Sequence, residues 1–556
     1  MKPPAQITQK LALERAEVLL TQILPPSGEI RAIVLFLLPL MEERKGTLPL
    51  VIHAAREWTG LKIGSVFFDY TGCGDSAGFL EELTPDQVDR ETADVLQWIH
   101  LAYPTLPICI VGTRISSCLP SRLTRQNPPN LSALIYWSPI DGEAFLKQLF
   151  QRRMINDMVA YGKAKENRKE LVERLGRGET IDLDGFALTP SLYTWLQGLR
   201  PYRGREAVSI PTLLIDGGHD IRSAALFAET GAECLTLRYP PFWNTVGQVD
   251  LEPLIHTTGD WLDHHLPAET QHIQFDHVED PDYPSLSTEG DGMIRLALNR
   301  PTQEPRGGIL FLPGWSGDRT GPHRIFTRAA RLFAAEGYLC ARVDFTGRGC
   351  SDGLASDASI LQMSADAEHA YSALRALLPR GKEITVLAIC SGCKVAITLA
   401  ADHPELAQLI LWSAESMGSL RDSTTGIRKA LHMLKAYARK SVRPETWKKI
   451  LRGKVDTQLV AKALVKHEKR SQEEAQAEDC TLRRFRSFTH PILFIYGGSD
   501  PDAAGSANAY GRFCGRYRIP YRLHTIAHAG HSYYGETWSQ ELLTESIRFL
   551  RDPKVS

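Results

Sequence analysis

Short apolar runs alternate with longer amphipathic stretches along most of the 556-residue chain. The apolar runs predict strands buried on both faces, and the stretches between them predict helices that cover a parallel sheet. In the second half, strands are expected at about 308–313, 339–344, 384–389, 408–412, 491–496 and 520–525. Helices are expected after most of them, for example over Ile325–Glu336 and Lys394–Ala401. The pattern predicts the α/β class, with a mostly parallel sheet flanked by helices.

The same unit is written twice in the chain. Three pairs of segments match: VFFDYTGCGDSAG (66–78) with ARVDFTGRGCSDG (341–353), LIYWS (134–138) with LILWS (409–413), and LLIDGGHD (213–220) with LFIYGGSD (493–500). The offsets within them are nearly constant: 344 − 69 = 275, 412 − 137 = 275 and 500 − 220 = 280. This predicts a tandem duplication with domains at 1–265 and 266–556.

Both copies break the alternation at one place. Residues of about 140–208 and 414–488 are charged and helix-prone, and each segment lies between two expected strands. We interpret them as inserted helical lids. At the N-terminus we expect a helix over about Ile7–Leu24, whereas 267–300 should supply leading strands that the first copy lacks.

A candidate nucleophile stands at a strand-to-helix turn of the second copy. In EITVLAICSGCKVAITLAA (383–401), small residues flank Cys390 in the order small–x–nucleophile–x–small, which selects Cys390 over the adjacent Ser391. Such a turn lifts one side chain above the carboxyl edge of the sheet, and the following helix N-terminus favours a thiolate.

A base and an acid follow in the order that α/β-hydrolases use. The loop HTIAHAGHSYYG (524–535) offers His524, His528 and His531, of which His531 follows a turn of small residues. FIYGGSDPD (494–502) offers Asp500 at the end of a strand. Asp502 is the fallback acid, and Glu415 is a weaker one. The carboxylate would hold the imidazole in the tautomer that a base needs. The backbone N–H groups of Ser391 and Trp315 are the expected oxyanion donors.

Two other interpretations of these motifs are open. Cys390 and Cys393 form a CxxC at a strand–helix junction, as in thioredoxin-like redox proteins, although such a fold explains neither the later acid and histidine nor the repeat. A regulatory disulfide between the two is a further alternative. The glycine-rich segments 72–78 and 347–353 lack the full dinucleotide-binding spacing, so Asp69 and Asp344 before them are interpreted as turn stabilisers.

The first copy has lost the same chemistry. Arg114 stands at the nucleophile position (390 − 114 = 276), RYPPFWNT (238–245) replaces the histidine loop, and only Asp220 persists. Pro39 replaces Gly314 in the oxyanion loop. Because a guanidinium stays protonated and a buried charge needs a partner, we expect Arg114 to pair with Glu42 or Glu43 and plug the old site. The alternative is that Arg114 binds a substrate carboxylate or phosphate.

Composition limits the binding partners and the cellular compartment that we expect for the protein. The formal net charge of −1 gives no electrostatic reason to expect nucleic acid or an anionic membrane as partner. The longest early apolar run, 33–40, is too short to span a bilayer. The ten scattered cysteines show no zinc spacing, so we expect reduced thiols, a cytoplasmic protein, no metal and no cofactor.

At these motifs the chain resembles the exosortase A system-associated hydrolases. The first copy is similar to type 2 in PLMEE (39–43), GCGDSAG (72–78), its arginine elbow and FLKQLFQRR (145–153), and the second resembles type 1 in its cysteine elbow. Because the two types are usually separate proteins, the resemblance implies that the two domains pack as a pseudo-heterodimer. It also implies ester or thioester acyl chemistry.

The expected activity is hydrolysis of a small-molecule or carrier-bound acyl substrate through a Cys390 acyl-enzyme. An acyl-thioester is reactive towards amines, so transfer or cyclisation onto an amine or alcohol is the alternative. A non-catalytic binding scaffold is the alternative of another class.

Overall fold

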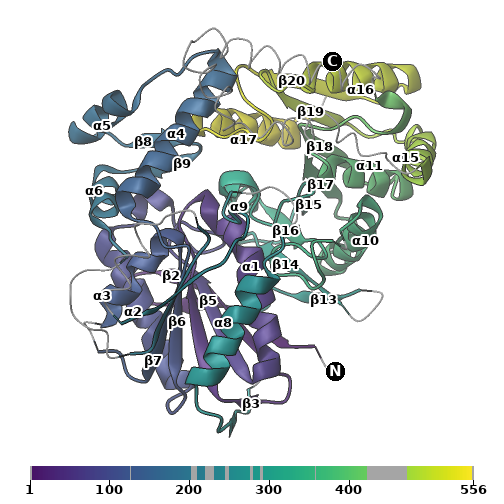
Figure 1. Ribbon diagram of the computed structural model, residues 1–556. Coiled ribbons are helices and arrows are strands. Elements are labelled where there is room, and N and C mark those ends of the chain that lie inside the picture. The colour runs from purple at the N-terminus through teal and green to yellow at the C-terminus, as the bar shows by residue number, and fades with distance from the viewer. Residues whose placement is uncertain are drawn as a thin grey trace.

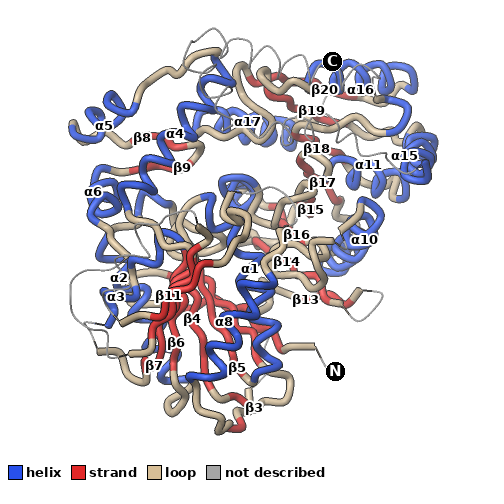
Figure 2. The backbone as a smooth tube through the Cα atoms, viewed as in Figure 1, coloured by secondary structure: helices blue, strands red, loops and turns tan. Residues whose placement is uncertain are grey.

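Two eight-stranded sheets, one in each half of the chain, dominate the part of the protein that the computed structural model describes (Figures 1 and 2). The described residues are 3–124, 127–201, 210–218, 231–244, 249–275, 280–288, 292–356, 358–421 and 472–553. Helices cover both faces of each sheet, and each half has apolar cores on the two sides of its own sheet.

The first sheet has the strand order β1-β2-β5-β4-β6-β7-β10-β11. Its first two pairings are antiparallel and the others are parallel. The strands are β1 (Ala5–Ala12), β2 (Glu17–Leu24), β4 (Ala32–Leu37), β5 (Ile63–Asp69), β6 (Ile108–Thr113), β7 (Leu131–Trp137), β10 (Thr212–Asp216) and β11 (Glu233–Thr236).

The second sheet repeats this topology in the order β13-β14-β16-β15-β17-β18-β19-β20. Again two antiparallel pairings at one edge lead into parallel strands. The strands are β13 (Ser285–Ser287), β14 (Met293–Asn299), β15 (Gly307–Leu312), β16 (Tyr338–Asp344), β17 (Ile384–Ile389), β18 (Gln408–Trp412), β19 (Ile492–Gly497) and β20 (Tyr521–Ile526). The predicted fold class is confirmed, and the six strands expected in this half agree within one residue.

The helices that cover the sheets follow the strands as the alternation predicts. In the first half they are α1 (Glu42–Trp58), α2 (Pro85–Ala102), α3 (Pro120–Leu123) and α8 (Glu252–His265). In the second half they are α9 (Ile325–Ala335), α10 (Ile360–Leu377), α11 (Gly392–Asp402), α16 (Ala503–Tyr517) and α17 (Glu536–Arg551). Short 3₁₀ turns lie at η1 (Thr59–Leu61), η2 (Leu80–Glu82), η3 (Arg114–Cys118), η5 (Pro322–Arg324) and η6 (Gly418–Leu420). In the described ranges no helix is both long and apolar enough to cross a membrane.

The expected N-terminal helix is wrong. Residues 5–24 form the antiparallel hairpin β1–β2, in the position that β13–β14 occupy in the second sheet. The first copy therefore does not lack leading strands. The error has a physical cause: β2 lies between β1 and β5 and is buried from Val18 to Leu24, and a short run buried on both faces looks alike in a strand and in a helix. The predicted boundary between 265 and 266 stays a prediction, with α8 ending at His265 and the two-residue strand β12 (Gln271–His272) pairing back onto β3 (Glu29–Ile30).

The first inserted segment lies between β7 and β10, as predicted, but it is not wholly helical. It contains α4 (Gly142–Tyr161), α5 (Arg168–Gly176), the hairpin β8 (Ile181–Leu183)–β9 (Phe186–Leu188) and α6 (Pro190–Gly198). Figure 1 shows α4 and this hairpin beside α17 of the second half. In the second insertion, η6 and α15 (Gln472–Phe485) are described, and 422–471 lie outside the described residues.

Matched contacts join the two halves. Arg56 of α1 donates to the backbone carbonyls of Cys350 and Ser351, at 3.0 Å each. Its counterpart Arg331 (331 − 56 = 275) donates to the carbonyls of Asp75 and Ser76, the counterparts of those residues (350 − 75 and 351 − 76 are also 275). The two halves thus present the same surface to each other: each binds the other's glycine-rich turn.

Buried charges seal this interface. Asp75 of the first half is bonded by Arg319 at 2.7 Å and by Arg342 at 2.6 Å, both from the second half. Burial alone raises the pKa of Asp75, but the two guanidinium groups outweigh it and hold that pKa far below its ordinary value. The turns themselves are held as predicted, because Asp69 accepts the N–H of Asp75 and Asp344 accepts the N–H of Cys350.

Candidate active site

Cys390 occupies a strained turn between β17 and α11. Its φ of 57° lies in the left-handed region, which an L residue other than glycine enters at a cost. Gly392 permits the turn, since a Cβ there would lie 2.5 Å from the carbonyl oxygens of Leu312 and Pro313. Gly314 also packs closely against the elbow, because a Cβ there would lie 3.1 Å from the Cys390 Cβ and 3.5 Å from its Sγ. The backbone is shaped to expose one side chain at the edge of the sheet.

The structure brings His531 and Asp500 to this side chain. The loop after β20 carries His531, and Asp500 follows β19. His531 Nδ1 lies 2.7 Å from Asp500 Oδ2, which leaves Nε2 for the thiol. Burial by itself lowers the pKa of His531, but its hydrogen bonds to Asp500 and Cys390 outweigh burial and raise that pKa to about 11. These two partners favour the protonated imidazole, so His531 is suited to take the proton of the Cys390 thiol.

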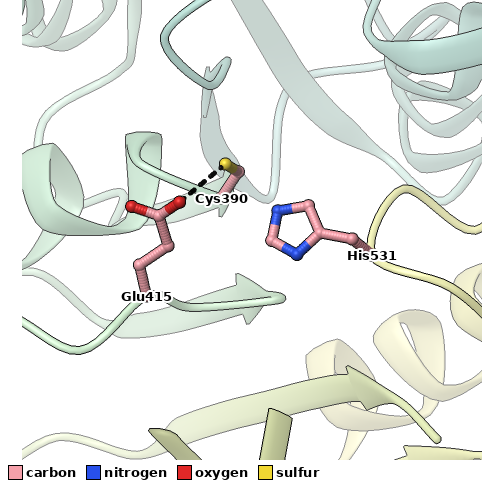
Figure 3. A group of neighbouring side chains, drawn as sticks. All are labelled: Cys390, Glu415 and His531. Carbon is pink, nitrogen blue, oxygen red and sulfur yellow. Dashed lines mark hydrogen bonds between the residues drawn. The ribbon is translucent and has the colours of Figure 1, made fainter. Parts of the chain in front are cut away.

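Glu415 is also in contact with the sulfur. The Cys390 thiol donates to Glu415 Oε1 at 3.4 Å, and Figure 3 shows Glu415 and His531 on either side of Cys390. Lys394 of α11 lies 3.3 Å from the other carboxylate oxygen. Burial raises the pKa of Glu415, but Lys394, the Cys390 hydrogen bond and His531 together lower it below its ordinary value. Glu415, predicted as a weak substitute for Asp500, therefore contacts the thiol instead.

The other candidate acid and base residues have separate partners. Asp502 donates its backbone N–H to Asp500 Oδ1 at 3.1 Å, so it helps to orient the Asp500 carboxylate. His524 lies 2.8 Å from Glu541, and the ring of His528 lies 4.9 Å from that of Tyr161.

One of the two predicted oxyanion donors is bonded to the side chain of Ser391, the residue that carries the other donor. The Trp315 N–H donates to Ser391 Oγ at 2.7 Å, so a serine hydroxyl occupies one of the two expected donors. The Trp315 side chain is 41% exposed and Arg348 donates to the Trp315 carbonyl at 2.6 Å. No pattern in the sequence predicts the Trp315–Ser391 bond, which depends on how closely the 313–317 loop approaches the elbow.

The second cysteine of the CxxC points away. Cys393 is fully buried in α11, its thiol donates to the Trp412 carbonyl, and burial raises its pKa well above the ordinary value. All ten cysteines, Cys390 and Cys393 included, are free thiols.

A cavity of about 1350 Å³ opens onto Cys390 and His531. Both halves of the chain line it. The second half contributes the oxyanion loop and the turn 347–355, and the first half contributes Glu42, Lys45, Arg152, Asn156 and Trp243, among others. The cavity next to the candidate nucleophile is therefore built across the interface between the halves.

At the equivalent elbow of the first half, Arg114 is buried and paired. Its φ of 52° matches that of Cys390. The guanidinium donates to Glu43 at 3.1 and 3.2 Å and to Gln148 at 3.0 Å, and it stacks 3.8 Å from the Trp243 ring centre. Of the two glutamates predicted to pair with it, Glu43 does so and Glu42 instead reaches the second half. Asp220 lies outside the described residues.

Cys390, Glu415 and His531 also offer a combination of atoms that could hold a metal ion. One ligand atom from each lies within 4.8 Å of the other two. Thiolate, carboxylate and imidazole are the ligands that Zn²⁺ takes, and a carboxylate behind the histidine, as Asp500 is here, commonly supports such a site.

Comparison with known proteins supports the fold of the second half. Residues 309–545, less than half of the chain, match the model of the alpha/beta hydrolase family, and this stretch contains Cys390, Asp500 and His531. No curated protein matches the sequence. Among solved structures, Est1E from Butyrivibrio proteoclasticus with bound ferulic acid is 15% identical, over 48% of this chain and 100% of its own (TM-score 0.34). An alpha-beta serine hydrolase homologue from Coxiella burnetii is 14% identical over 50% and 100% (0.32), and the Pyrococcus furiosus esterase Pf2001 is 17% identical over 48% and 89% (0.34).

Proposed function

We propose that the protein is an acyl hydrolase, an esterase or thioesterase, that works through an acyl-enzyme on Cys390. The observation that carries the proposal is the position of His531, bonded to Asp500 at 2.7 Å on one side and facing the elbow cysteine on the other. This is the geometry of a nucleophile, its base and the group that orients the base.

In the first step His531 takes the thiol proton and the sulfur attacks the acyl carbonyl. The C–S bond forms, the tetrahedral oxyanion collapses, and the bond to the leaving alcohol or thiol breaks as His531 returns the proton to it. In the second step His531 takes a proton from water and the hydroxide attacks the thioester carbonyl. The C–S bond then breaks, His531 returns the proton to the Cys390 sulfur, and the carboxylic acid leaves.

The Ser391 and Trp315 N–H groups are the proposed oxyanion donors. Since Trp315 N–H is bonded to Ser391 Oγ at rest, the substrate oxyanion must displace that hydroxyl. Glu415 has a role in the same proposal. It accepts a hydrogen bond from the resting Cys390 thiol, and the thiol proton passes to His531 when the sulfur attacks.

We propose that the first half supports the second half and catalyses no reaction of its own. Arg114 has a carboxylate, an amide and an indole around it, which favours the plug over a substrate-binding arginine. The two halves work as one pseudo-heterodimer in a reducing, cytoplasmic setting, in keeping with ten free cysteines and with the resemblance to the two exosortase-associated hydrolase types.

Intact mass after incubation with a panel of neutral acyl thioesters tests the proposal. We expect an adduct with the mass of the acyl group on wild-type protein, mapped to Cys390, and none on Cys390→Ala. Adding an amine or an alcohol in the same assay identifies the acceptor: an amide or ester product in place of the free acid would establish acyl transfer over hydrolysis. Absence of any adduct and of any turnover would favour the scaffold.

Divalent cations separate the nucleophile from a metal site. If Cys390 and His531 act as nucleophile and base, Zn²⁺ binding to Cys390, Glu415 and His531 should inhibit, and a chelator should restore full turnover. Glu415→Gln should weaken this inhibition. Loss of turnover on chelating the purified protein, with recovery on adding Zn²⁺, would instead make this a metal-dependent hydrolase.

A further inference from the structure

Glu42 and Glu43 stand side by side in the sequence but serve different halves. Glu43 turns inward to Arg114, whereas Glu42 crosses the interface. Its Oε1 accepts the Tyr534 hydroxyl at 2.7 Å and its Oε2 accepts the His323 backbone N–H at 3.2 Å. Both partners belong to the second half, and Tyr534 lies three residues after His531.

The two partners of Glu42 are themselves linked to the histidine loop. His323 Nε2 lies 3.2 Å from the carbonyl oxygen of Ser532, the residue next to His531, and the rings of His323 and Tyr534 are 5.1 Å apart. Burial lowers the pKa of His323 to about 3, so its ring is neutral and Nε2–H can donate to that carbonyl. Glu42 thus secures the loop at two places, directly through Tyr534 and through His323.

Three more contacts from the first half lie around the loops that carry Asp500 and His531. The Ser499 hydroxyl, next to Asp500, donates to the Ala160 carbonyl at 3.0 Å. The Tyr161 ring packs on His528, and Asp182 accepts the Glu536 N–H at 2.8 Å. All come from α4 or the β8–β9 hairpin, so the inserted segment of the first half covers the loops that carry the acid and the histidine of the second.

The Glu42 contact has no mirror image. The position equivalent to Glu42 in the second half is Gly317 (317 − 42 = 275), which has no side chain to reach back. The matched arginine contacts run in both directions, but this one runs only towards the half that has a histidine loop. A contact that served only to pack the halves together would be expected on both sides of the interface, as the arginine contacts are, and not just beside the loop that carries His531.

We propose that Glu42 is a positioning residue for His531: the first half, without reacting itself, fixes the histidine loop of the second half through the Glu42–Tyr534 bond. The inference rests on the proposed role of Cys390 and His531. It gives the first half a defined task, which is to hold His531 within reach of Cys390, where a misplacement of about 1 Å can cost ~100-fold in rate.

Substitutions at both ends of the bond test the proposal. Glu42→Ala and Tyr534→Phe should each lower kcat for a neutral thioester by ~10- to 100-fold with KM little changed. The double variant should be no slower than Glu42→Ala, because Tyr534→Phe removes an interaction that Glu42→Ala has already removed. Glu42→Gln keeps an oxygen that can accept the tyrosine hydroxyl and should recover most of the rate. Asp282→Asn, which weakens the partly exposed contacts of Asp282 with Lys10 of the first half and with Arg300, is the matched control and should leave kcat unchanged.

A second readout does not depend on turnover. Iodoacetamide alkylation of Cys390 at mildly acidic pH requires His531 to stabilise the thiolate, since an isolated thiol is almost wholly protonated there. We expect slower alkylation in Glu42→Ala and Tyr534→Phe, followed on the Cys390 peptide by mass. Tyr534→Phe removes one oxygen only, which keeps the test valid if Glu42→Ala fails to fold.

The outcomes separate this inference from the proposed function. If wild-type protein is acylated and Tyr534→Phe has the same kcat and the same alkylation rate as wild type, the proposed role of Glu42 is overturned. The proposed Cys390 chemistry would be unaffected by that result. A rise in KM confined to the Glu42 variants would make Glu42 a substrate contact and would also overturn it. Wild-type protein with neither acyl adduct nor enhanced alkylation would sink the proposed function itself.

Discussion

Two neighbouring aspartates near His531 have roles that a single atom distinguishes. Asp500 gives a carboxylate oxygen to His531 Nδ1, whereas Asp502 gives Asp500 only a backbone N–H. Asp500→Asn should therefore lower kcat by about 10²- to 10⁴-fold, because an amide can donate to Nδ1 and hold the wrong tautomer. Asp502→Asn keeps its N–H and should stay within about threefold of wild type. Steady-state kinetics on both variants checks this; equal losses would contradict the assignment of Asp500.

At the same scale, the sequence located the residues but not their contacts. Cys390, Asp500 and His531 were predictable because each ends a strand, and the carboxyl ends of parallel strands share one edge of a sheet. The Glu415–Cys390 bond and the Glu42–Tyr534 bond were not. Each depends on a side-chain direction or on the packing of two domains, and neither leaves a pattern of spacing along the chain.

At the scale of elements, the elbow of the first half replaces a nucleophile by a buried ion pair. The side chains of Arg114 and Glu43 are 4% and 8% exposed. Arg114→Leu leaves Glu43 buried without a cation and should lower the free energy of unfolding by about 3–5 kcal/mol. Arg114→Leu with Glu43→Leu removes both charges and should recover most of that loss.

Denaturant unfolding measures these changes, and the rate of acylation at Cys390 is the companion readout. Normal acylation in the double variant would agree with a plug. A rise in KM there, in folded protein, would revive the alternative in which Arg114 binds the substrate.

The elements themselves were predicted best where strands and helices alternate, and worst at the N-terminus. The residues of the β1–β2 hairpin suggest a helix because its second strand is buried on both faces and shows no alternation of apolar and polar residues. Likewise, the charged composition of the first insertion gave no sign of the β8–β9 hairpin, whose three-residue strands are too short for a periodicity.

For the molecule as a whole, the ion pairs of Asp75 with Arg319 and Arg342 join the two halves, and we expect them to couple the unfolding of the halves. Asp75→Asn would leave Arg342 without its carboxylate in the interface and should cost about 3–5 kcal/mol at neutral pH, whereas Asp282→Asn, at the partly exposed contact with Lys10, should cost under about 1 kcal/mol. Both can be measured in one denaturant transition.

The pH dependence of that difference has a defined sign. The pKa of Asp75 is lower in the folded protein than its ordinary 3.8, so the carboxylate stabilises fully above that pH and loses its contribution as the pH falls. The gap in unfolding free energy between wild type and Asp75→Asn should therefore be constant near neutrality and shrink in acid. A gap that widens in acid would contradict the ion-pair account.

The reciprocal contacts of Arg56 and Arg331 have a consequence for ancestry. Two surfaces in which residue i meets j′ while i′ meets j are related by a two-fold axis, the symmetry of a homodimer. In such a dimer one gene encodes both subunits, so a substitution that removed one nucleophile would have removed the other as well. Two copies in a single reading frame are free of that constraint, because each can change alone. A chain of this kind can carry an arginine at one elbow and a cysteine at the other, as Arg114 and Cys390 do here.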